Sequence, residues 1–380
     1  MKVETIQTAG FRIPLARPWG DQTHSIDHIE LVVTDVRTDS GTAGTGFAYT
    51  VGTGARAVEA LLDGYIAPLL EGTEVAPRAQ WWRMWRSLHD AGGGGLTTIA
   101  IAACDIALWD AVAKAQGRPL TAVLGQFRSS IPAYGSGVNL NLGPRDLEEQ
   151  VRRWLDGGYA AFKVKVGHPE PEADLERLAM VRRVIGDGAK LMVDANQGWD
   201  VAAAESALRT YQRFNLTWVE EPLLSDDVSG HAALRRRVEQ QLAIGENVYT
   251  AYQFNDYLRQ DACDVVQADV VRVGGITPWL EIADLARVWG RPMAPHFMLE
   301  LSGQLLCCIP NGLVLEDVDG GSFRELGILA EDVGVERGRF TPPERPGHGI
   351  VFDPARLDRY AVEGRVQPAA RSGDVRRGTV

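Results

Sequence analysis

Three carboxylates recur at equal intervals through the middle of the 380-residue chain, each at the end of a short apolar run. Asp194, Glu220 and Glu246 are separated by 26 and again by 26 residues, which is the spacing of one strand and one helix. Because the carboxyl ends of consecutive parallel strands meet at one edge, these side chains are expected to converge. Converging carboxylates repel one another unless a cation joins them, and hard oxygen ligands favour Mg²⁺. The spacing therefore predicts a magnesium site.

Two lysines precede this series on a run that reads as a strand. Lys163 and Lys165 flank Val164, and side chains two residues apart on a strand point to the same side. If Val164 faces the helices, both ammonium groups face the interior, where they need carboxylates or a substrate anion as partners. An isolated Lys-Val-Lys at a strand end is more often solvated. The neighbouring acids favour a shared site.

An aspartate and a histidine follow the next two apolar runs. Asp269 and His296 are 27 residues apart, so they are expected at the ends of adjacent strands. A hydrogen bond between them would orient the imidazole and raise its basicity, as in other acid–base dyads. Glu316 lies at the end of the last run. Burial would raise its pKa and let the protonated carboxyl donate a hydrogen bond to a developing oxyanion.

Eight short apolar runs are expected to be the strands that position these side chains. They are 131–136, 161–166, 190–194, 216–220, 242–246, 265–268, 292–295 and 313–316. A helix-sized amphipathic segment fills nearly every gap, and this alternation predicts an α/β fold with a modified (β/α)8 barrel of the TIM type. A doubly wound open sheet is the alternative, but the sequence contains neither a GxGxxG nor a Walker loop to support it.

The barrel is expected to be the middle one of three parts. Residues 1–130 have strand-like and then helical patterns and predict an α+β capping domain, whose loops 19–25 and 49–54 would close over the barrel as lids. Residues 131–345 form the catalytic barrel. Residues 346–380 are expected to return to the capping domain and to end in a loosely held, arginine-containing tail, 364–380.

Charge excludes some classes of partner. Fifty acidic against 39 basic residues give a net charge of −11, which argues against nucleic acid or an anionic membrane surface. The acidity belongs mainly to the surface. The three carboxylates, one Mg²⁺ and two protonated lysines leave the site itself at about +1, which suits a carboxylate substrate.

The remaining composition predicts a cytoplasmic protein. The four cysteines, of which two are adjacent, form no CxxC pair, which is typical of reduced thiols: Cys104, Cys263, Cys307 and Cys308. No signal-peptide core is expected at the N-terminus. No apolar run is expected to approach the ~20 residues that span a bilayer, so no membrane association is predicted.

Several segments taken together resemble the enolase superfamily, in the mandelate racemase-like subgroup of its mandelate racemase/muconate-lactonizing branch. The resemblance runs from about residue 1 to residue 360 and rests on segments 105–110, 163–165, 193–196, 219–222, 245–247 and 272–277. It implies that Lys165 is a base and that Lys163 neutralises the substrate carboxylate. It also implies Mg²⁺ on the acidic triad, a second acid–base catalyst formed by Asp269 and His296, and an electrophilic donor at Glu316. A muconate-lactonizing arrangement would place a lysine where Asp269 stands.

The resemblance implies abstraction of the proton α to a carboxylate, through an enediolate that Mg²⁺ stabilises. Three outcomes stay open: dehydration of an acid sugar, cycloisomerisation, and racemisation or epimerisation. Similarity to galactarate/talarate-type dehydratases favours dehydration of an aldonic or aldaric acid. A non-catalytic sugar-acid binding protein on the same fold is a remote alternative.

Four residues outside the catalytic set are expected to contact the substrate: Trp19, His24, Asn196 and Asn247. His24 could bind a distal hydroxyl or carboxylate from the lid, although a surface histidine is an equally good interpretation. Asn196 points the same way as Asp194 and is expected to touch substrate or metal-bound water. By analogy with the family, the protein is expected to be a homo-oligomer.

Overall fold

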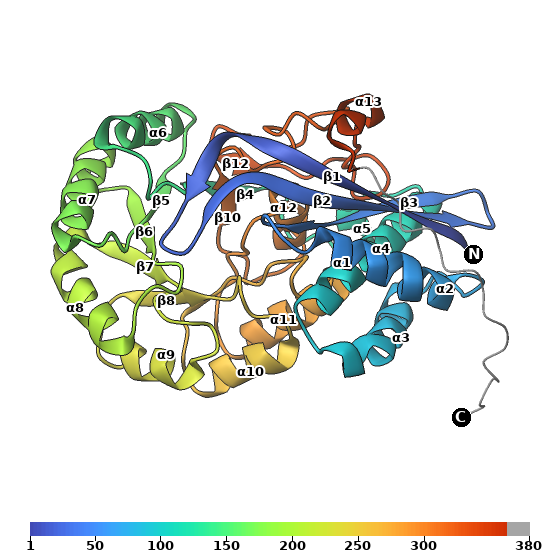
Figure 1. Ribbon diagram of the computed structural model, residues 1–380, viewed down its shortest axis with the longest axis horizontal. Helices are drawn as coiled ribbons and strands as arrows, with labels where there is room; N and C mark the ends of the chain where they lie inside the picture. The colour runs from blue at the N-terminus through green and yellow to red at the C-terminus, as the bar shows by residue number, and fades with distance from the viewer. Residues whose placement is uncertain (363–380) are drawn as a thin grey trace.

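A curled sheet ringed by helices and a smaller antiparallel sheet lie side by side in the computed structural model, which describes residues 1–362 (Figure 1). The smaller sheet has the order β1 (Val3–Gly20), β2 (Ser25–Thr38) and β3 (Ala43–Thr50). The helical elements that follow it are α1 (Ala55–Leu61), η1 (Leu62–Ile66), α2 (Ala67–Leu70), α3 (Pro77–Leu88), η2 (His89–Ala91), α4 (Leu96–Ala115) and α5 (Leu120–Leu124). We call β1 to α5 the cap.

Helix α4 packs directly against β3 because two glycines of β3 have no side chain to keep the helix backbone away. A Cβ atom on Gly44 would lie 2.1 Å from the Ala107 carbonyl oxygen, and one on Gly46 would lie 2.0 Å from that of Ala103. The helix is long and apolar enough to span a membrane by length and composition, contrary to the expectation that no run approaches that length. However, 78% of its most apolar stretch is buried, as befits the core helix of the cap.

The barrel strands run parallel in the order of the chain. They are β4 (Ile131–Ser136), β5 (Ala161–Lys165), β6 (Lys190–Asp194), β7 (Leu216–Glu220), β8 (Gln241–Ile244), β9 (Val265–Val266) and β10 (Leu315–Val318). β10 pairs with β4, so the curled sheet returns to its first strand. The predicted α/β barrel with a cap is confirmed.

Helices follow the strands, and most of them form the outer ring of Figure 1. They are α6 (Pro144–Asp156), α7 (Pro171–Ile185), α8 (Val201–Tyr211), η3 (Gln212–Phe214), α9 (Val228–Arg235), α10 (Ala251–Arg259), α11 (Ile276–Val288) and α12 (Leu299–Leu306). The described chain ends with β11 (Val335–Glu336), β12 (Arg339–Phe340), α13 (Pro354–Leu357) and η4 (Asp358–Tyr360).

The prediction of a strand at 292–295 was wrong. Met293 makes only isolated parallel bridges, to Val266 on one side and to Gly312 on the other, so the barrel closes here through single pairs. β9 is also shorter than predicted, and β10 begins two residues later than predicted. Short apolar runs do not mark strand ends closely, because burial and hydrogen-bonded pairing need not stop at the same residue.

The last described segment contacts the cap. Gly347 forms a bridge with Pro119, and Ala361 forms one with Phe11. His348 is fully buried, and its Nε2 lies 2.7 Å from the Thr45 carbonyl oxygen of β3. The predicted loose tail, 364–380, lies outside the described residues, and the division of the chain at residues 130 and 345 stays a prediction.

Candidate active site

The three predicted metal ligands converge at the carboxyl ends of consecutive strands. Asp194 ends β6, Glu220 ends β7, and the two are register partners. Glu246 stands two residues beyond β8. All three are buried, and one oxygen from each lies within 4.8 Å of the others. This arrangement brings together the side chains that the spacing of 26 residues singled out.

The two predicted lysines point into the same interior. Lys165 Nζ lies 2.5 Å from Asp194 Oδ2, while Lys163 Nζ bonds to Glu220 and lies 2.6 Å from Glu316 Oε1. Burial lowers the pKa of Lys163, but the carboxylates of Glu220 and Glu316 outweigh it and hold that pKa well above its usual value. The surrounding acids raise the pKa of both lysines and so favour the ammonium form wherever no cation neutralises those acids.

The two lysines do not fully neutralise the buried carboxylates of the site. Burial raises the pKa of Glu220 well above its usual value; Lys163 opposes this shift, and repulsion from Asp194 adds to it. Beside the triad, Asn196 Oδ1 and Glu221 Oε1 are buried without a hydrogen-bond partner. A surplus of buried negative charge and unpaired oxygens is what a hard divalent cation would satisfy. The residues present therefore fit Mg²⁺, with Asp194, Glu220 and Glu246 as ligands.

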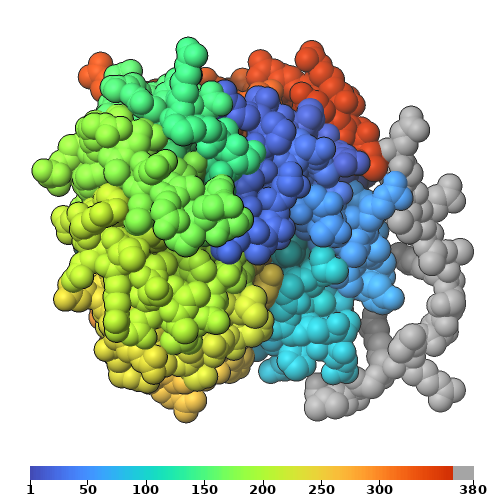
Figure 2. Space-filling model, turned by 60° about the vertical axis from the view of Figure 1, so that its left-hand side comes forward, coloured from blue at the N-terminus to red at the C-terminus, as the bar shows by residue number. Residues whose placement is uncertain are grey.

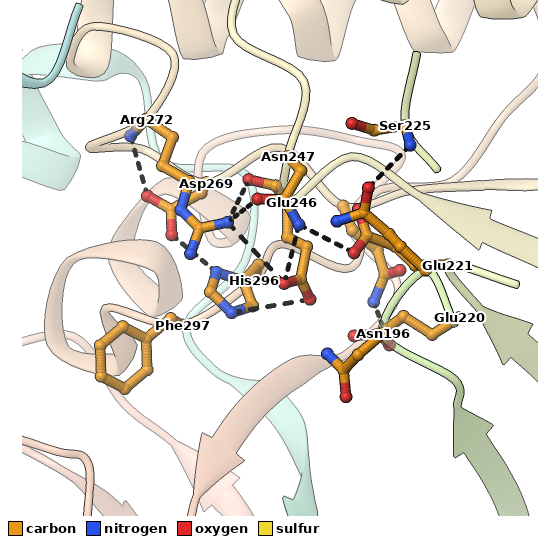
Figure 3. Close-up of polar contacts among 12 residues, drawn as sticks. Asn196, Glu220, Glu221, Ser225, Glu246, Asn247, Asp269, Arg272, His296 and Phe297 are labelled. Carbon is orange, nitrogen blue, oxygen red and sulfur yellow. Dashed lines mark hydrogen bonds and ion pairs between the residues drawn. The ribbon is translucent and has the colours of Figure 1, made fainter. Parts of the chain in front are cut away.

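The predicted Asp–His pair is formed beside the triad. His296 Nδ1 lies 2.7 Å from Asp269 Oδ2, and His296 Nε2 lies 3.8 Å from Glu246 Oε2 (Figure 3). Burial raises the pKa of Asp269, but the hydrogen bond and charge of His296 outweigh it, so that the pKa is lowered overall. The carboxylate is further fixed at Oδ1, which accepts the backbone N–H groups of Val271 and Arg272. The imidazole is thus oriented with Nε2 toward the acids.

The expectation of a protonated Glu316 was wrong for this structure. Glu316 lies inside β10 rather than at its end. Burial raises the pKa of Glu316, but the charges of Lys163 and His296 lower it by more. Its oxygens accept hydrogen bonds from Ser136 Oγ at 2.7 Å and from the Phe297 backbone N–H at 2.9 Å. Both oxygens of Glu316 therefore act as acceptors here, and the lysine that the resemblance assigned to the substrate also pairs with it.

One cavity of about 260 Å³ brings the catalytic and substrate-contact candidates together. It lies between cap and barrel, and Figure 2 shows the blue cap segments directly against the green barrel segments. Its lining includes all four predicted substrate contacts, Trp19, His24, Asn196 and Asn247, together with Lys163, Lys165, His296 and Glu316.

The four predicted substrate contacts are not equally available. The Trp19 indole N–H donates to the Asp319 carbonyl oxygen, so Trp19 can offer the cavity only its aromatic ring. His24 has a largely exposed side chain beside Asp21. Asn247 donates to Glu221 at 2.9 Å and accepts from Arg272 at 2.6 Å, so both ends of its amide are already bonded. Asn247 is better placed to orient these neighbours than to bind substrate.

Sequence reasoning missed several residues that support the site. Tyr49, from the cap, donates its hydroxyl to Asp269 Oδ2 at 2.6 Å, and nothing in the sequence marks this contact between distant segments. Gln267 donates to Glu220 Oε2 at 2.6 Å, and its place two residues before Asp269 could have indicated it. Arg272 donates to the Glu246 carbonyl oxygen at 2.8 Å, so it braces the loop that carries a metal ligand.

A capped barrel with an acidic triad, paired lysines and an Asp–His dyad defines a class of metal-dependent acid–base enzymes. Residues 146–356 match the family described as enolase C-terminal domain-like, and residues 5–125 match the mandelate racemase/muconate lactonizing enzyme N-terminal domain. The chain therefore belongs to the mandelate racemase/muconate-lactonizing branch of the enolase superfamily.

Two relatives at 33% identity or more are named for reactions of sugar acids. The chain is 36% identical to 3,6-anhydro-alpha-L-galactonate cycloisomerase of Streptomyces coelicolor, over 95% of this chain and 99% of that protein. It is 33% identical to L-talarate/galactarate dehydratase of Salmonella typhimurium, over 92% and 89% respectively.

Solved structures agree with this placement. A Streptomyces coelicolor racemase with bound magnesium has a TM-score of 0.91 at 35% identity, covering 95% of this chain and all of that chain. L-Talarate dehydratase from Polaromonas sp. JS666, in complex with Mg and L-glucarate, has a TM-score of 0.88 at 34% identity, covering 95% and 98%. Magnesium is thus the metal of similar structures, and this chain carries the corresponding acidic triad.

Proposed function

We propose that the protein is a Mg²⁺-dependent enzyme that removes the proton α to the carboxylate of a sugar acid and expels the β-oxygen, most simply as a dehydratase. One observation carries the proposal: Glu246, a member of the buried triad that fits Mg²⁺, lines the same cavity as two candidate proton-transfer groups, Lys165 and His296. When bound, Mg²⁺ supplies Lewis-acid stabilisation of negative charge on the substrate carboxylate.

The two proton-transfer groups approach the cavity from opposite sides of the closed barrel. Lys165 ends β5, whereas His296 follows the bridge at Met293, on the far side of the sheet order. Lys165 takes the α-proton as the neutral amine, after it has lost its own proton, and Lys163 is placed to balance the charge of the substrate carboxylate. His296, held by Asp269, gives a proton to the departing β-oxygen. One C–H and one C–O bond break, and the resulting enol becomes a 2-keto-3-deoxy acid.

Cycloisomerisation is the second candidate, and the 36% identical relative favours it. The same catalytic residues can perform this reaction if the β-oxygen belongs to an anhydro ring. Elimination of a free hydroxyl releases water, whereas elimination of a ring ether leaves the oxygen attached to the product and gives an isomer. The same proton transfers by Lys165 and His296 serve both reactions, and the substrate decides between them.

The cap is proposed to supply specificity and to exclude water. Residues of both predicted lid loops line the cavity, among them Trp19, His24, Tyr49 and Thr53. The first loop also touches the barrel, since Gln22 Nε2 donates to the Gly198 carbonyl oxygen at 3.4 Å. A closed cavity strengthens the electrostatic interactions on which α-proton removal depends. A cytoplasmic location and a homo-oligomeric state stay predictions.

A screen of sugar acids and their 3,6-anhydro forms, read by a 2-keto-acid assay and product mass, tests this function. A 2-keto acid lighter than its substrate by one water indicates dehydration, and one of equal mass indicates cycloisomerisation. Both products must require Mg²⁺. A 2-hydroxy-acid product of inverted configuration would instead indicate racemisation, and binding without any reaction would indicate a sugar-acid binding protein.

A further inference from the structure

The charges around the cavity are unevenly distributed between barrel and cap. The barrel contributes Lys163, Lys165 and Arg272 together with the acids of the site. Among the described cavity-lining residues of the cap, His24 is the only basic side chain, and Asp21 accompanies it. A substrate carboxylate seated at the barrel end therefore projects the rest of the molecule toward a cap that offers little positive charge.

Asp21 holds its negative charge at the cap end of the cavity. Its Oδ1 accepts the backbone N–H groups of Thr23 and His24, each at 2.7 Å, and the Thr23 hydroxyl at 3.0 Å. His24 Nδ1 lies 3.2 Å from both carboxylate oxygens of Asp21. A protonated His24 is thus already balanced by its neighbour, so this pair gives a second substrate carboxylate no net attraction.

Arg272, the remaining candidate for a second carboxylate, is committed elsewhere. Its Nη1 donates both to the Glu246 carbonyl oxygen and to Asn247 Oδ1 (Figure 3). The guanidinium also lies 3.7 Å from Glu246 Oε1. The contacts of Nη1 therefore hold the guanidinium against the acidic side of the barrel.

The rest of the cap-side lining carries no charge, and part of it is apolar. Ile26, Val51, Leu96 and Ile99 come from the cap, and Val138 and Val318 face them from the barrel. The Thr50 hydroxyl does not offer its proton to a ligand, because it donates to Glu30 Oε2 at 2.8 Å. A carboxylate pressed against these surfaces would lose water without gaining a cation, which is strongly unfavourable.

We propose that the substrate is a monocarboxylate with an uncharged far end, an aldonate or anhydroaldonate rather than an aldarate. This inference rests on the proposed function and narrows it. The cavity selects against a second carboxylate in two ways: the Asp21–His24 pair gives it no net attraction, and the apolar side chains of the lining remove water from it.

Matched aldonate and aldarate pairs, identical in configuration and differing only at the terminal carbon, provide the test. Initial rates of Mg²⁺-dependent 2-keto-acid formation give kcat/KM for both members of each pair. We expect the best monoacid to exceed its diacid by about 100-fold. A diacid that reacts as well as its monoacid would overturn this inference and leave the proposed function standing. Reaction of neither class, with no α-proton exchange, would overturn both.

A variant that adds a positive charge to the cap tests whether charge causes this selectivity. Thr53 lines the cavity from the second lid loop and is exposed. Thr53→Arg adds the missing cation and should raise the diacid-to-monoacid ratio of kcat/KM about tenfold, whereas Thr53→Gln adds similar length without charge and should not. An equal ratio in the two variants, with unchanged thermal stability, would contradict the electrostatic explanation.

Discussion

The Tyr49 hydroxyl, carried by the cap, and the Asp269 carboxylate, carried by the barrel, are joined by a buried 2.6 Å hydrogen bond. The accepting atom, Oδ2, is the one that also faces His296 Nδ1. A residue of the second lid loop therefore helps to fix the acid that orients the imidazole. This contact links the position of the cap to the geometry of the dyad, and it has a direct experimental consequence.

Removing this hydroxyl should slow turnover. Tyr49→Phe leaves Asp269 with one hydrogen bond fewer and the imidazole less firmly held, so kcat should fall about tenfold, the equivalent of one lost hydrogen bond. Tyr211→Phe is the matched control, because Tyr211 also donates a buried hydrogen bond to an aspartate, Asp174, and neither residue lines the cavity. The control should lose stability but keep kcat. Equal kcat in both variants would contradict the role given to Tyr49.

Loss of the imidazole should separate the two proton transfers. His296→Asn removes the group that protonates the leaving oxygen, so elimination should stop, while exchange of the α-proton through Lys165 continues. Product assay and NMR of the recovered substrate in D₂O measure the two processes. His231→Asn is the control, since His231 is a buried histidine of α9 bonded to the Asp227 carbonyl oxygen. Full elimination activity in His296→Asn would refute the dyad assignment.

Metal binding should depend on the charge of Glu220. Glu220→Gln keeps the shape of the side chain and removes one of three carboxylate ligands, so Mg²⁺ affinity should fall by about 100-fold or more. Calorimetric titration of the purified protein with Mg²⁺ measures this without any substrate. Asp317→Asn is the control, because Asp317 follows Glu316 on the same strand but bonds to Tyr159. Unchanged affinity in Glu220→Gln would count against the triad.

Stability should fall as the pH rises from 4.5 to about 8 because of Glu300, which is 1% exposed. Burial raises its pKa from 4.5 to about 8, and its Oε2 has no hydrogen-bond partner. The folded state therefore favours the protonated carboxyl. Its contribution to stability is complete below the unfolded pKa and is lost as pH rises through about 8.

Glu300→Gln should remove this pH dependence. The variant should gain stability relative to the natural chain as pH increases, by at most about 1.4 kcal/mol per pH unit between the two pKa values. Urea unfolding of both proteins over this pH range gives the difference directly. A constant difference at every pH would show that Glu300 does not titrate as its burial implies.

The parts of the site that sequence reasoning identified were those with a regular repeat. Asp194, Glu220 and Glu246 recur once per strand and helix, and parallel strands of one barrel must bring such residues to one edge. Lys163 and Lys165 were likewise assigned to one side by the two-residue period of a strand.

The missed features depend on contacts between segments that lie far apart in the sequence. Tyr49 and Asp269 are 220 residues apart, and no local pattern connects them. Glu316 was expected to be protonated because burial was considered without its neighbour, Lys163, whose charge reverses the shift. The segment 292–295 reads as a strand but forms only isolated bridges, since its partners on either side are themselves short.

Exchange of the substrate α-proton with solvent tests the central claim most directly. The protein is incubated in D₂O with a sugar monoacid, with Mg²⁺ or with a chelator, and the recovered substrate and product are followed by NMR. We predict Mg²⁺-dependent deuterium incorporation at the α-carbon or release of the α-proton into product, and loss of both in Lys165→Ala. Product formed with Mg²⁺ absent, or undiminished exchange in Lys165→Ala, would contradict the account.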